Sequence, residues 1–374
     1  MERPNRLLPS LASLSFESVV KAKSRLVNCI VHILKIKFNL CLCVCFFCLP
    51  VISLQAKSVL IVGAGPAGLA SAIEAHQRGY EVTLLEKRDE YTRSQLIFLL
   101  EPSLALLEKW DVTIPHMKVF CFNNEKVGGV QIKYLEKGLE EKIHQLGIKK
   151  IQGTFVDFAE DFRVKATDAE GTFSLSYDFL VAADGIHSQV REAAHIPSRH
   201  LGSARGVWIW MNFSVPFDEC EVSSILTKET YFIRKISVWN KKIIFLQSLP
   251  NQLENFCTSS LQDLSDKAAE CGWHQEAELI AKGNVRVCDN IEILLQQAET
   301  FVEESKSVLV IGDAAACGSF FYGKGVNTAL LTATIAGDFF DNIQINPEAA
   351  YGIFNQEIKK ATDELINHSM FLFK

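Results

Sequence analysis

A run of glycines at 63–68 is the part of the sequence whose residue types and spacing most directly suggest chemistry. It reads GAGPAG and follows Ser58 and four apolar residues, a run that predicts a strand buried on both faces. Gly63 permits a tight turn, Gly65 has no Cβ to keep a ligand from the backbone, and Gly68 lets the next helix pack close to the strand. The N-terminus of that helix attracts phosphate through its free N–H groups and dipole. The pattern predicts a phosphate-binding turn, to which Ala67 also belongs.

An acidic residue at the end of the next expected strand completes this pattern. Residues 80–85 read as that strand, Glu86 closes it, and Lys87 follows. A carboxylate in this place can accept hydrogen bonds from both ribose hydroxyls of an adenosine. The agreement in spacing predicts a dinucleotide site that includes Glu86 and Lys87, and the alternative is an ordinary βαβ unit with a glycine turn. The motif alone does not choose between FAD and NAD.

Two later segments also place an acidic residue directly after an apolar strand. In 177–191 the strand ends in Asp184-Gly185, where Asp184 can hold a hydroxyl or fix the loop and Gly185 can bring N–H groups near an anion. In 307–315 the strand ends in a Gly-Asp pair, and the carboxylate of Asp313 suits two hydrogen bonds from a polyol. Three separated motifs fit one long, extended FAD better than NAD, which needs only the first.

The three motifs in this order resemble the class A flavin monooxygenases, the family of p-hydroxybenzoate hydroxylase, over most of the chain after residue 57. The resemblance implies that the Asp184 segment lies near the FAD pyrophosphate and that Asp313 binds the ribityl hydroxyls. It also implies a helix after residue 322 whose N-terminus points at the flavin ring. The residues that this helix start would bring to the cofactor are Gly323, Gly325, Val326 and Asn327.

Two weaker matches to the family lie between these motifs. Arg93 occupies the place of a family arginine near the flavin or the NAD(P)H path, and the alternative is a solvated loop arginine. Gln131, or else Lys133, stands where the family places Arg or Gln against the pyrophosphate, just before an expected amphipathic helix. The resemblance therefore adds Arg93 and Gln131 to the expected FAD site.

Two positions depart from the family pattern. Ala316 stands where a His is expected after the Gly-Asp motif, and Phe320 stands where a Pro is expected. In the family this proline shapes the loop over the flavin, so Phe320, Phe321 and Tyr322 would place bulky aromatic groups there instead. The binding role expected for Asp313 is not affected.

The resemblance implies a reaction as well as a cofactor. NADPH or NADH would reduce bound FAD, O2 would add at flavin C4a, and the peroxide would transfer one oxygen atom to a small apolar or aromatic substrate. Because no second glycine motif is present, NAD(P)H is expected to bind transiently. The alternatives are an FAD-dependent reductase of the prenyl reductase type and a non-catalytic flavin-binding protein. The sequence identifies no catalytic acid or base.

The expected fold is α/β, with a Rossmann-type FAD-binding domain built in three layers on a parallel sheet, an inserted antiparallel substrate sheet and C-terminal helices. Period-two alternation at 206–213 and apolar runs at 230–233, 236–239 and 242–247 predict the antiparallel strands. Their large side chains either line an apolar pocket or pack the sheet. These are Trp208, Trp210, Phe232, Trp239 and Phe245.

The expected division of the chain has four parts. Residues 57–198 and 285–342 form the FAD-binding domain, 199–284 form the substrate domain, and 343–374 form a C-terminal helical segment. Residues 1–56 are set apart as a leader or membrane anchor, because 38–54 are almost wholly apolar. A signal peptide, a membrane anchor and a buried core helix are the three interpretations of that run. The protein would be exported or attached to a membrane under the first two, and cytoplasmic otherwise.

Composition excludes some partners and sites. The chain has 374 residues, a formal net charge of −6 and no Lys/Arg-rich block, so nucleic acid is not an expected partner. Its 11 cysteines lack the paired spacing of a disulfide framework or a zinc site, and no metal is expected.

Overall fold

The computed structural model describes most of the chain after residue 55. Residues Ala56–Lys374 form one compact unit. The described ranges are 56–122, 124–212, 221–222, 226–227, 231–238, 241–249, 260–320 and 323–373. The apolar run 38–54 and the residues Trp239, Phe321 and Tyr322 lie outside them.

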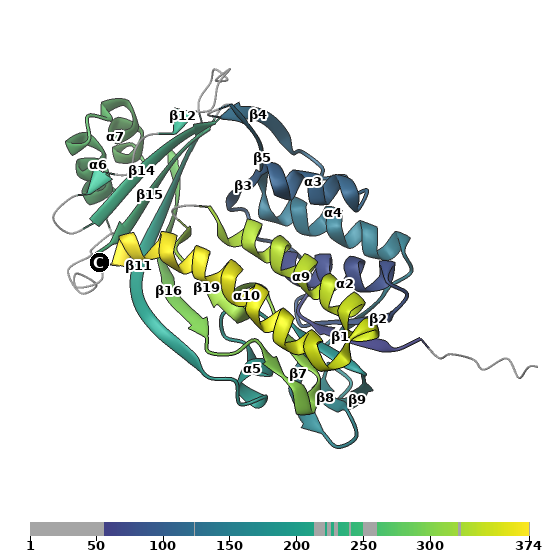
Figure 1. Cartoon of the computed structure of the whole chain (residues 1–374). Helices are drawn as coiled ribbons and strands as arrows, with labels where there is room; N and C mark the ends of the chain where they lie inside the picture. Colours follow the sequence, from purple (N-terminus) through teal and green to yellow (C-terminus); the bar gives the residue numbers. More distant parts are fainter. Residues whose placement is uncertain are drawn as a thin grey trace, which may run out of the picture. The chain divides into compact units, whose positions relative to one another are not determined.

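A parallel sheet, built from strands of both the early and the late part of the chain, forms the centre of one part of the fold (Figure 1). Among the described residues, six strands make up this sheet, and only its edge strand β17 runs antiparallel to its neighbour. Their order across the sheet is β17 (Val302–Glu303), β18 (Val308–Val310), β10 (Phe179–Ala182), β1 (Ser58–Val62), β2 (Glu81–Glu86) and β6 (Lys149–Gln152).

Helix α2 (Pro66–Gln77) makes the crossover from β1 to β2. It is rich in alanine, and nine of its twelve residues are buried. Small residues allow this close approach because they keep the helix near the sheet and its neighbours. Helices α4 (Ile132–Gln145) and α9 (Gly325–Ile345) pack against α2, and α10 (Pro347–Met370) runs beside α9 (Figure 1).

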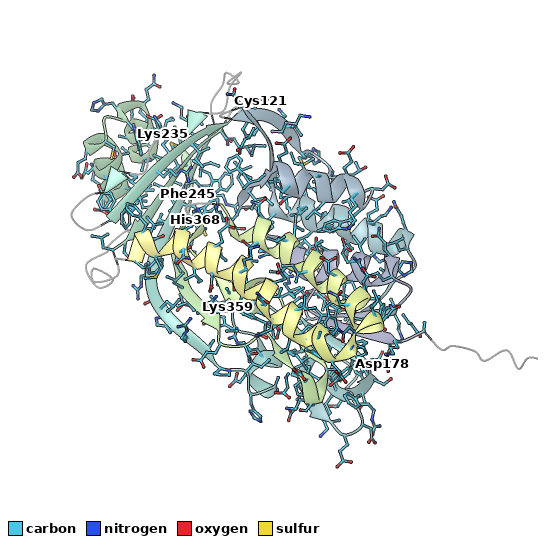
Figure 2. All side chains as sticks on the ribbon, in the orientation of Figure 1. Cys121, Asp178, Lys235, Phe245, Lys359 and His368 are labelled. Carbon is cyan, nitrogen blue, oxygen red and sulfur yellow. The ribbon has the colours of Figure 1, made fainter. Side chains whose placement is uncertain are left out.

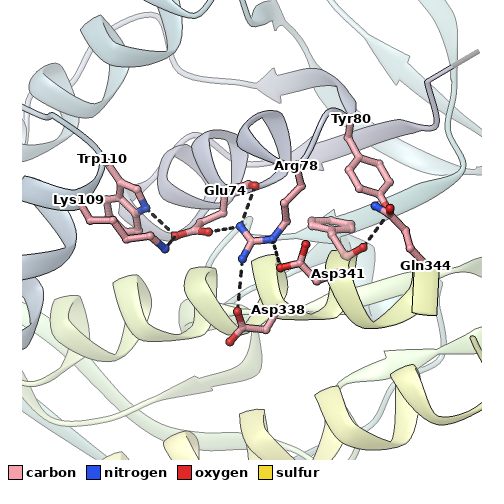
Figure 3. Close-up of polar contacts among 9 residues, drawn as sticks. Glu74, Arg78, Tyr80, Lys109, Trp110, Asp338, Asp341 and Gln344 are labelled. Atoms are coloured by element: carbon pink, nitrogen blue, oxygen red, sulfur yellow. Dashed lines mark hydrogen bonds and ion pairs between the residues drawn. The ribbon is translucent and has the colours of Figure 1, made fainter. Parts of the chain in front are cut away.

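A polar network centred on the buried Glu74 joins α2 to α9 and to α3 (Glu101–Lys109) (Figure 3). Glu74 of α2 is fully buried, and its Oε1 accepts hydrogen bonds from Trp110 Nε1 at 2.6 Å and Lys109 Nζ at 3.0 Å. Its Oε2 accepts from Arg78, whose Nε donates to Asp341 of α9 at 2.7 Å. The network fixes α9, whose N-terminus belongs to the candidate site, relative to α2.

The other part of the fold centres on an antiparallel sheet. Its main path is β12 (Glu221–Val222), β14 (Tyr231–Val238), β15 (Lys241–Ser248), β11 (Ser198–Asn212), β16 (Val285–Ala298) and β19 (Ala316–Cys317), and β13 (Leu226–Thr227) pairs with β14. One face carries α6 (Leu261–Glu270) and α7 (His274–Ala281) on an apolar layer. Lys235 of β14 projects to this face (Figure 2), where its Nζ lies 3.3 Å from Glu276 of α7.

The opposite face of this sheet is aromatic. Trp208 of β11 lies opposite Phe245 of β15, with ring centroids 4.1 Å apart. Leu96 of β3 and Leu372 of the 3-10 helix η4 (Phe371–Phe373) pack into the same apolar cluster. This cluster joins the antiparallel sheet to β3, which follows β2 in the chain.

Shorter elements complete the described fold. They are the sheet β3 (Leu96–Leu100), β5 (Glu125–Gln131) and β4 (Lys118–Phe122), the sheet β7 (Thr154–Ala159), β8 (Arg163–Thr167) and β9 (Thr172–Ser176), the helices α5 (Gln189–Ala193) and α8 (Gly312–Ala315), and the 3-10 helix η2 (Glu304–Lys306).

The parallel sheet, the antiparallel sheet and the C-terminal helices confirm the expected fold class, but two details differ. The strands expected at 230–233 and 236–239 are one strand, β14, because the polar pair Arg234-Lys235 between them continues the extended backbone. Residues 285–298, expected in the FAD-binding domain, form β16 and pair along β11 in the antiparallel sheet. Within the described ranges, no helix combines the length and apolar character needed to cross a membrane.

Candidate functional site

The three sequence motifs meet at one edge of the parallel sheet. Strands β1, β10 and β18 are neighbours, and the residues at their carboxyl ends pair as Val62 with Ala182 and Ala182 with Val310. A Cβ added at Gly63 would lie 2.4 Å from the Ala183 carbonyl oxygen, and one added at Gly312 would lie 2.7 Å from Ala67 Cβ. Parallel α/β sheets bind their ligands at this carboxyl edge.

The glycine turn has a closed side and an open side. Gly63 has a φ of 100°, and Gly68 packs so closely that an added Cβ would lie 1.9 Å from the Gly63 carbonyl oxygen. Gly65, by contrast, has nothing within 4 Å of an added Cβ. It is the N-cap of α2, and no side chain caps that helix end. The open backbone and the uncapped helix N-terminus suit an approaching phosphate.

Glu86 lies at the end of β2 with its carboxylate already engaged. Oε2 accepts a hydrogen bond from the Ala64 amide at 2.5 Å, and Oε1 accepts from the Arg88 amide at 2.9 Å and from Arg88 Nε at 3.0 Å. Burial acts to raise the pKa of Glu86, but the hydrogen bonds from Arg88 and Ala64 outweigh it and lower the pKa. Lys87 is exposed, so Arg88 rather than Lys87 is the basic residue that contacts Glu86.

Asp184 fixes the loop after β10. Its Oδ1 accepts from Ser188 Oγ at 2.5 Å and its Oδ2 accepts from the Val190 amide at 3.2 Å. Burial raises the pKa of Asp184 although these hydrogen bonds oppose the shift. Ser188 in turn caps α5 by accepting from the Arg191 amide at 3.0 Å. The geometry therefore supports the loop-fixing role of Asp184 and leaves no carboxylate oxygen without a protein donor.

Asp313 has a different environment from Glu86 and Asp184. Its side chain is exposed, and it makes no hydrogen bond or ion pair with any described residue. Surrounding protein nevertheless withdraws it from bulk water and raises its pKa, while the positive charge of Arg93 opposes the shift. A carboxylate in these surroundings, with no partner among the described residues, could accept hydrogen bonds from a polyol, and the binding of ribityl hydroxyls by Asp313 stays a prediction.

Several polar atoms around the start of α4 are buried without a partner. Buried polar atoms in native proteins are nearly always hydrogen-bonded, to protein, ligand or ordered water. Arg93 donates from Nη2 to Glu136 of α4, and the segment 93–95 hydrogen-bonds the first turn of that helix. The atoms left unpartnered are Tyr91 OH, Arg93 Nε, Gln95 Oε1 and Glu136 Oε2. Together with the open glycine turn and Asp313, these donors and acceptors fit a polar dinucleotide.

The remaining expected contacts lie at two helix starts. Gln131 is the N-cap of α4 without a side-chain hydrogen bond to that helix. Asn327, in the first turn of α9, accepts from the Leu100 amide at 2.9 Å and from Ser103 Oγ at 2.7 Å, and its Nδ2 donates to the Phe98 carbonyl at 2.9 Å. The Asn327 side chain thus fixes α9 to β3 and α3. These contacts do not use the backbone N–H groups in the first turn of α9, which a ligand could approach.

Gly323 and Gly325 stand at the start of α9, and nothing lies within 4 Å of a Cβ added at either. Val326 follows in the first turn and packs partly buried against the main core. Within the described ranges, no side chain caps this helix end. The Gly323 amide donates to the Phe320 carbonyl at 3.0 Å, so the N–H groups open to a ligand would be those of the first turn of α9.

The two departures from the family pattern are both packed against the antiparallel sheet. Ala316 is buried in the short strand β19, which pairs with β16. Phe320 lies 5.4 Å from Trp208 and 5.9 Å from Phe245, measured between ring centroids. Its ring also fills the space beside Gly206, where an added Cβ would lie 2.8 Å from Phe320. The loop between Asp313 and α9 is therefore anchored on the aromatic face.

Sequence reasoning missed Arg88 and Glu136. Arg88 follows the strand-end acid by two residues, a spacing that lets a side chain fold back onto the strand end. Glu136 lies between Leu135 and Leu139 on the inward stripe of an amphipathic helix, where a charged residue is unusual. That position was the available signal for a buried carboxylate.

Known proteins resemble the chain over different spans. Residues 57–206 match the pyridine nucleotide-disulphide oxidoreductase family. Kynurenine 3-monooxygenase of Legionella pneumophila (strain Corby) is 22% identical, with 84% of this chain and 79% of that protein covered. Four further curated relatives match at 27% to 32% identity, and the chain spans only 3% to 37% of their length.

Solved structures share the fold. PqsL, described as a probable FAD-dependent monooxygenase from Pseudomonas aeruginosa, superposes with a TM-score of 0.65 at 16% identity, covering 84% of this chain and 95% of that one. The tetrameric form of 2-methyl-3-hydroxypyridine-5-carboxylic acid oxygenase gives a TM-score of 0.64 at 20% identity, covering 84% and 90%. The chain therefore shares the fold of these oxygenases and is similar in sequence to a kynurenine 3-monooxygenase.

Proposed function

We propose that the protein is an FAD-dependent monooxygenase that uses NADPH or NADH to hydroxylate a small apolar or aromatic substrate. The observation that carries the proposal is the meeting of the glycine turn, the Asp184 loop and Asp313 at one edge of the parallel sheet. The unpartnered carboxylate of Asp313 and the four unpartnered atoms around the start of α4 support it.

Each part of the site has a binding role in this proposal. The open backbone at Gly65 and the start of α2 hold the pyrophosphate, Glu86 holds the adenosine ribose, and Asp313 holds the ribityl hydroxyls. Glu86 can do so because a carboxylate oxygen accepts more than one hydrogen bond. Bound FAD would supply the electron-transfer and oxygen chemistry, which side chains alone do not provide.

The start of α9 and the aromatic face complete the proposed reaction site. The N-terminus of α9 favours negative charge nearby, so it would stabilise a reduced, anionic flavin ring. Trp208, Phe245 and Phe320 form a packed apolar cluster, which would keep water away from a neighbouring apolar or aromatic substrate. Reductant would bind transiently, because the sequence holds a single glycine motif of the dinucleotide type.

The test begins with the absorption spectrum of the purified, FAD-reconstituted chain. We expect flavin bands that remain with the protein through gel filtration, and a colourless, well-folded protein would refute the proposal. Anaerobic stopped-flow mixing with NADPH or NADH should then bleach these bands. A non-catalytic flavin-binding protein would leave them unchanged.

Oxygen consumption separates a monooxygenase from a reductase on the same fold. With NAD(P)H and a panel of aromatic compounds, a monooxygenase consumes O2 and yields a hydroxylated product that carries one atom of 18O from 18O2. A reductase oxidises NAD(P)H with little O2 uptake. Catalase and a peroxide assay distinguish coupled hydroxylation from release of H2O2.

A further inference from the structure

The carboxylate of Glu136 is buried in the interior beside the candidate cofactor site. Its side chain has 0% exposure, and Oε1 accepts a hydrogen bond from Arg93 Nη2. Arg88 Nη1 lies 3.8 Å from the same oxygen, and Arg88 also contacts Glu86. A chain of charges thus runs from Glu86, at the expected adenosine end, through Arg88 and Glu136 to Arg93.

This arrangement is costly for folding alone. Removing a carboxylate from water costs several kcal/mol, and an ion pair in the interior often only balances that cost. Burial raises the pKa of Glu136, and the charges of Arg93 and Arg88 oppose the shift without reversing it. Because Oε2 of Glu136 has no partner among the described residues, packing does not explain why a carboxylate occupies this position.

Arg93 is the residue that the carboxylate constrains. The Arg93 side chain is 40% exposed, and its Nε is buried without a partner. It pairs with Glu136 of α4, and its positive charge opposes the rise in the pKa of Asp313. A guanidinium is planar with five donors in a fixed fork, so fixing one edge of the fork sets the direction of the remaining donors.

We propose that Glu136 is a positioning residue, which holds Arg93 so that its free donors face an anionic group of the bound dinucleotide. The inference rests on the proposed FAD site. Arg93 would contact the dinucleotide there, and Glu136 would hold the Arg93 side chain in the direction that this contact needs. An unpaired arginine of this length samples many rotamers, and ordering it on binding costs free energy that the Glu136 contact has already offset in the apoprotein.

The test measures the FAD dissociation constant of the apoprotein by quenching of flavin fluorescence. Glu136→Gln keeps the shape and removes the charge, and we expect the dissociation constant to rise about tenfold or more. Glu140→Gln is the matched control, because Glu140 lies one turn further along α4 and pairs with Lys150 instead. We expect that variant to bind FAD within about twofold of the wild type.

A double-mutant cycle shows whether Glu136 acts through Arg93. In an Arg93→Ala background, Glu136→Gln should change the dissociation constant by less than about twofold. Arg93→Ala removes a positive charge, so the dependence of its dissociation constant on NaCl concentration should be weaker than in the wild type. Glu136→Gln leaves Arg93 charged, so its loss of affinity should persist at high NaCl concentration if it arises from the lost orientation of Arg93. A merely structural role for Glu136 would give the same loss of affinity in the Arg93→Ala background.

The outcomes distinguish the inference from the proposed function. If the wild-type protein binds FAD and Glu136→Gln binds it equally well, or if the two substitutions are additive, the positioning role is refuted and the FAD site stands. If the folded wild type does not bind FAD, the proposed function and the positioning role of Glu136 are both refuted. Should Glu136→Gln fail to accumulate, Glu136→Met replaces it, because a buried apolar side chain of similar volume carries no unpaired polar group.

Discussion

Arg191 Nη1 donates a hydrogen bond to the carbonyl oxygen of Ala314 at 2.5 Å, and this contact joins the second motif to the third. Nη2 of the same side chain reaches the Ile186 carbonyl at 3.3 Å. Arg191 is buried, and burial lowers its pKa despite the opposing charge of Asp184. One guanidinium therefore holds the loop after β10 and the residue next to Asp313 at a fixed separation.

Replacing this arginine should loosen both motifs at once. Arg191→Lys offers a single ammonium group, which cannot serve both carbonyl groups in a fork geometry. We expect a loss of about 2 kcal/mol in unfolding free energy and an FAD dissociation constant raised about tenfold. Urea unfolding and fluorescence titration measure the two effects. Arg199→Lys, at an exposed arginine of β11, is the control and should change neither.

Gly65→Ala should separate cofactor binding from folding. An added methyl at Gly65 meets open space, and the φ of −76° suits alanine, so the apoprotein should be as stable as the wild type or more so. The same methyl would obstruct the expected phosphate, and FAD affinity should fall about tenfold or more. Calorimetry of the apoprotein and FAD titration give the two values, and unchanged affinity would remove the phosphate from this turn.

Gly63→Ala is the opposite case. With a φ of 100° and a Cβ only 2.4 Å from the Ala183 carbonyl oxygen, alanine cannot be accommodated without moving β1 or β10. We expect a loss of about 3 kcal/mol or more, seen as a lower denaturation midpoint before FAD is added. A stable Gly63→Ala apoprotein would contradict the packing described for the turn.

Asp313→Asn should weaken FAD binding without weakening the apoprotein. The carboxylate has no protein partner to lose, and its hydrogen bonds to a polyol would be worth about 1.5–3 kcal/mol, or roughly 10-fold to 150-fold in affinity. The folded pKa lies above the ordinary value of 3.8, so the folded apoprotein binds more protons at this site than the unfolded chain. Wild-type stability relative to Asp313→Asn should therefore fall as pH rises above 3.8. Urea midpoints of both apoproteins across pH check the sign.

The network around Glu74 predicts a loss of stability far from the cofactor edge. Glu74→Ala leaves Arg78 and the buried Trp110 Nε1 without their shared acceptor, and we expect a cost of about 3–5 kcal/mol in denaturant unfolding (Figure 3). Asp338→Asn is the control, because Asp338 is 63% exposed and lies 3.4 Å from Arg78. Its effect should be within about 1 kcal/mol.

Sequence reasoning reached the parts of the molecule that local pattern determines. The glycine turn and the strand-end acid Glu86 carry residue types that a specific backbone geometry requires, so their positions could be predicted from spacing. The start of α9 and the roles expected of Asp184 and Asp313 came from the resemblance to a flavoprotein family. The structure adds that β1, β10 and β18 are neighbours in one sheet.

Contacts between distant segments were beyond that reasoning. The pairing of Arg93 with Glu136 joins residues 43 positions apart, and Arg78 reaches Asp341 across 263 positions. Such pairs depend on how helices pack, which a single sequence does not encode in any short pattern. The sequence likewise singled out Phe320 as a departure but not its packing on Trp208, because that contact brings a loop of one half of the fold onto the sheet of the other.

The loop before α9 is attached on two sides. Ser319 donates from Oγ to Gln247 Oε1 of β15 at 2.7 Å, and its amide donates to Ser369 Oγ of α10 at 3.0 Å. Hydrogen bonds therefore hold this loop, β15 and the C-terminal end of α10 together. A chimaera that imports β15 from a homologue to redirect chemistry would have to import residues 316–320 and the last turn of α10 with it, as a single exchangeable block.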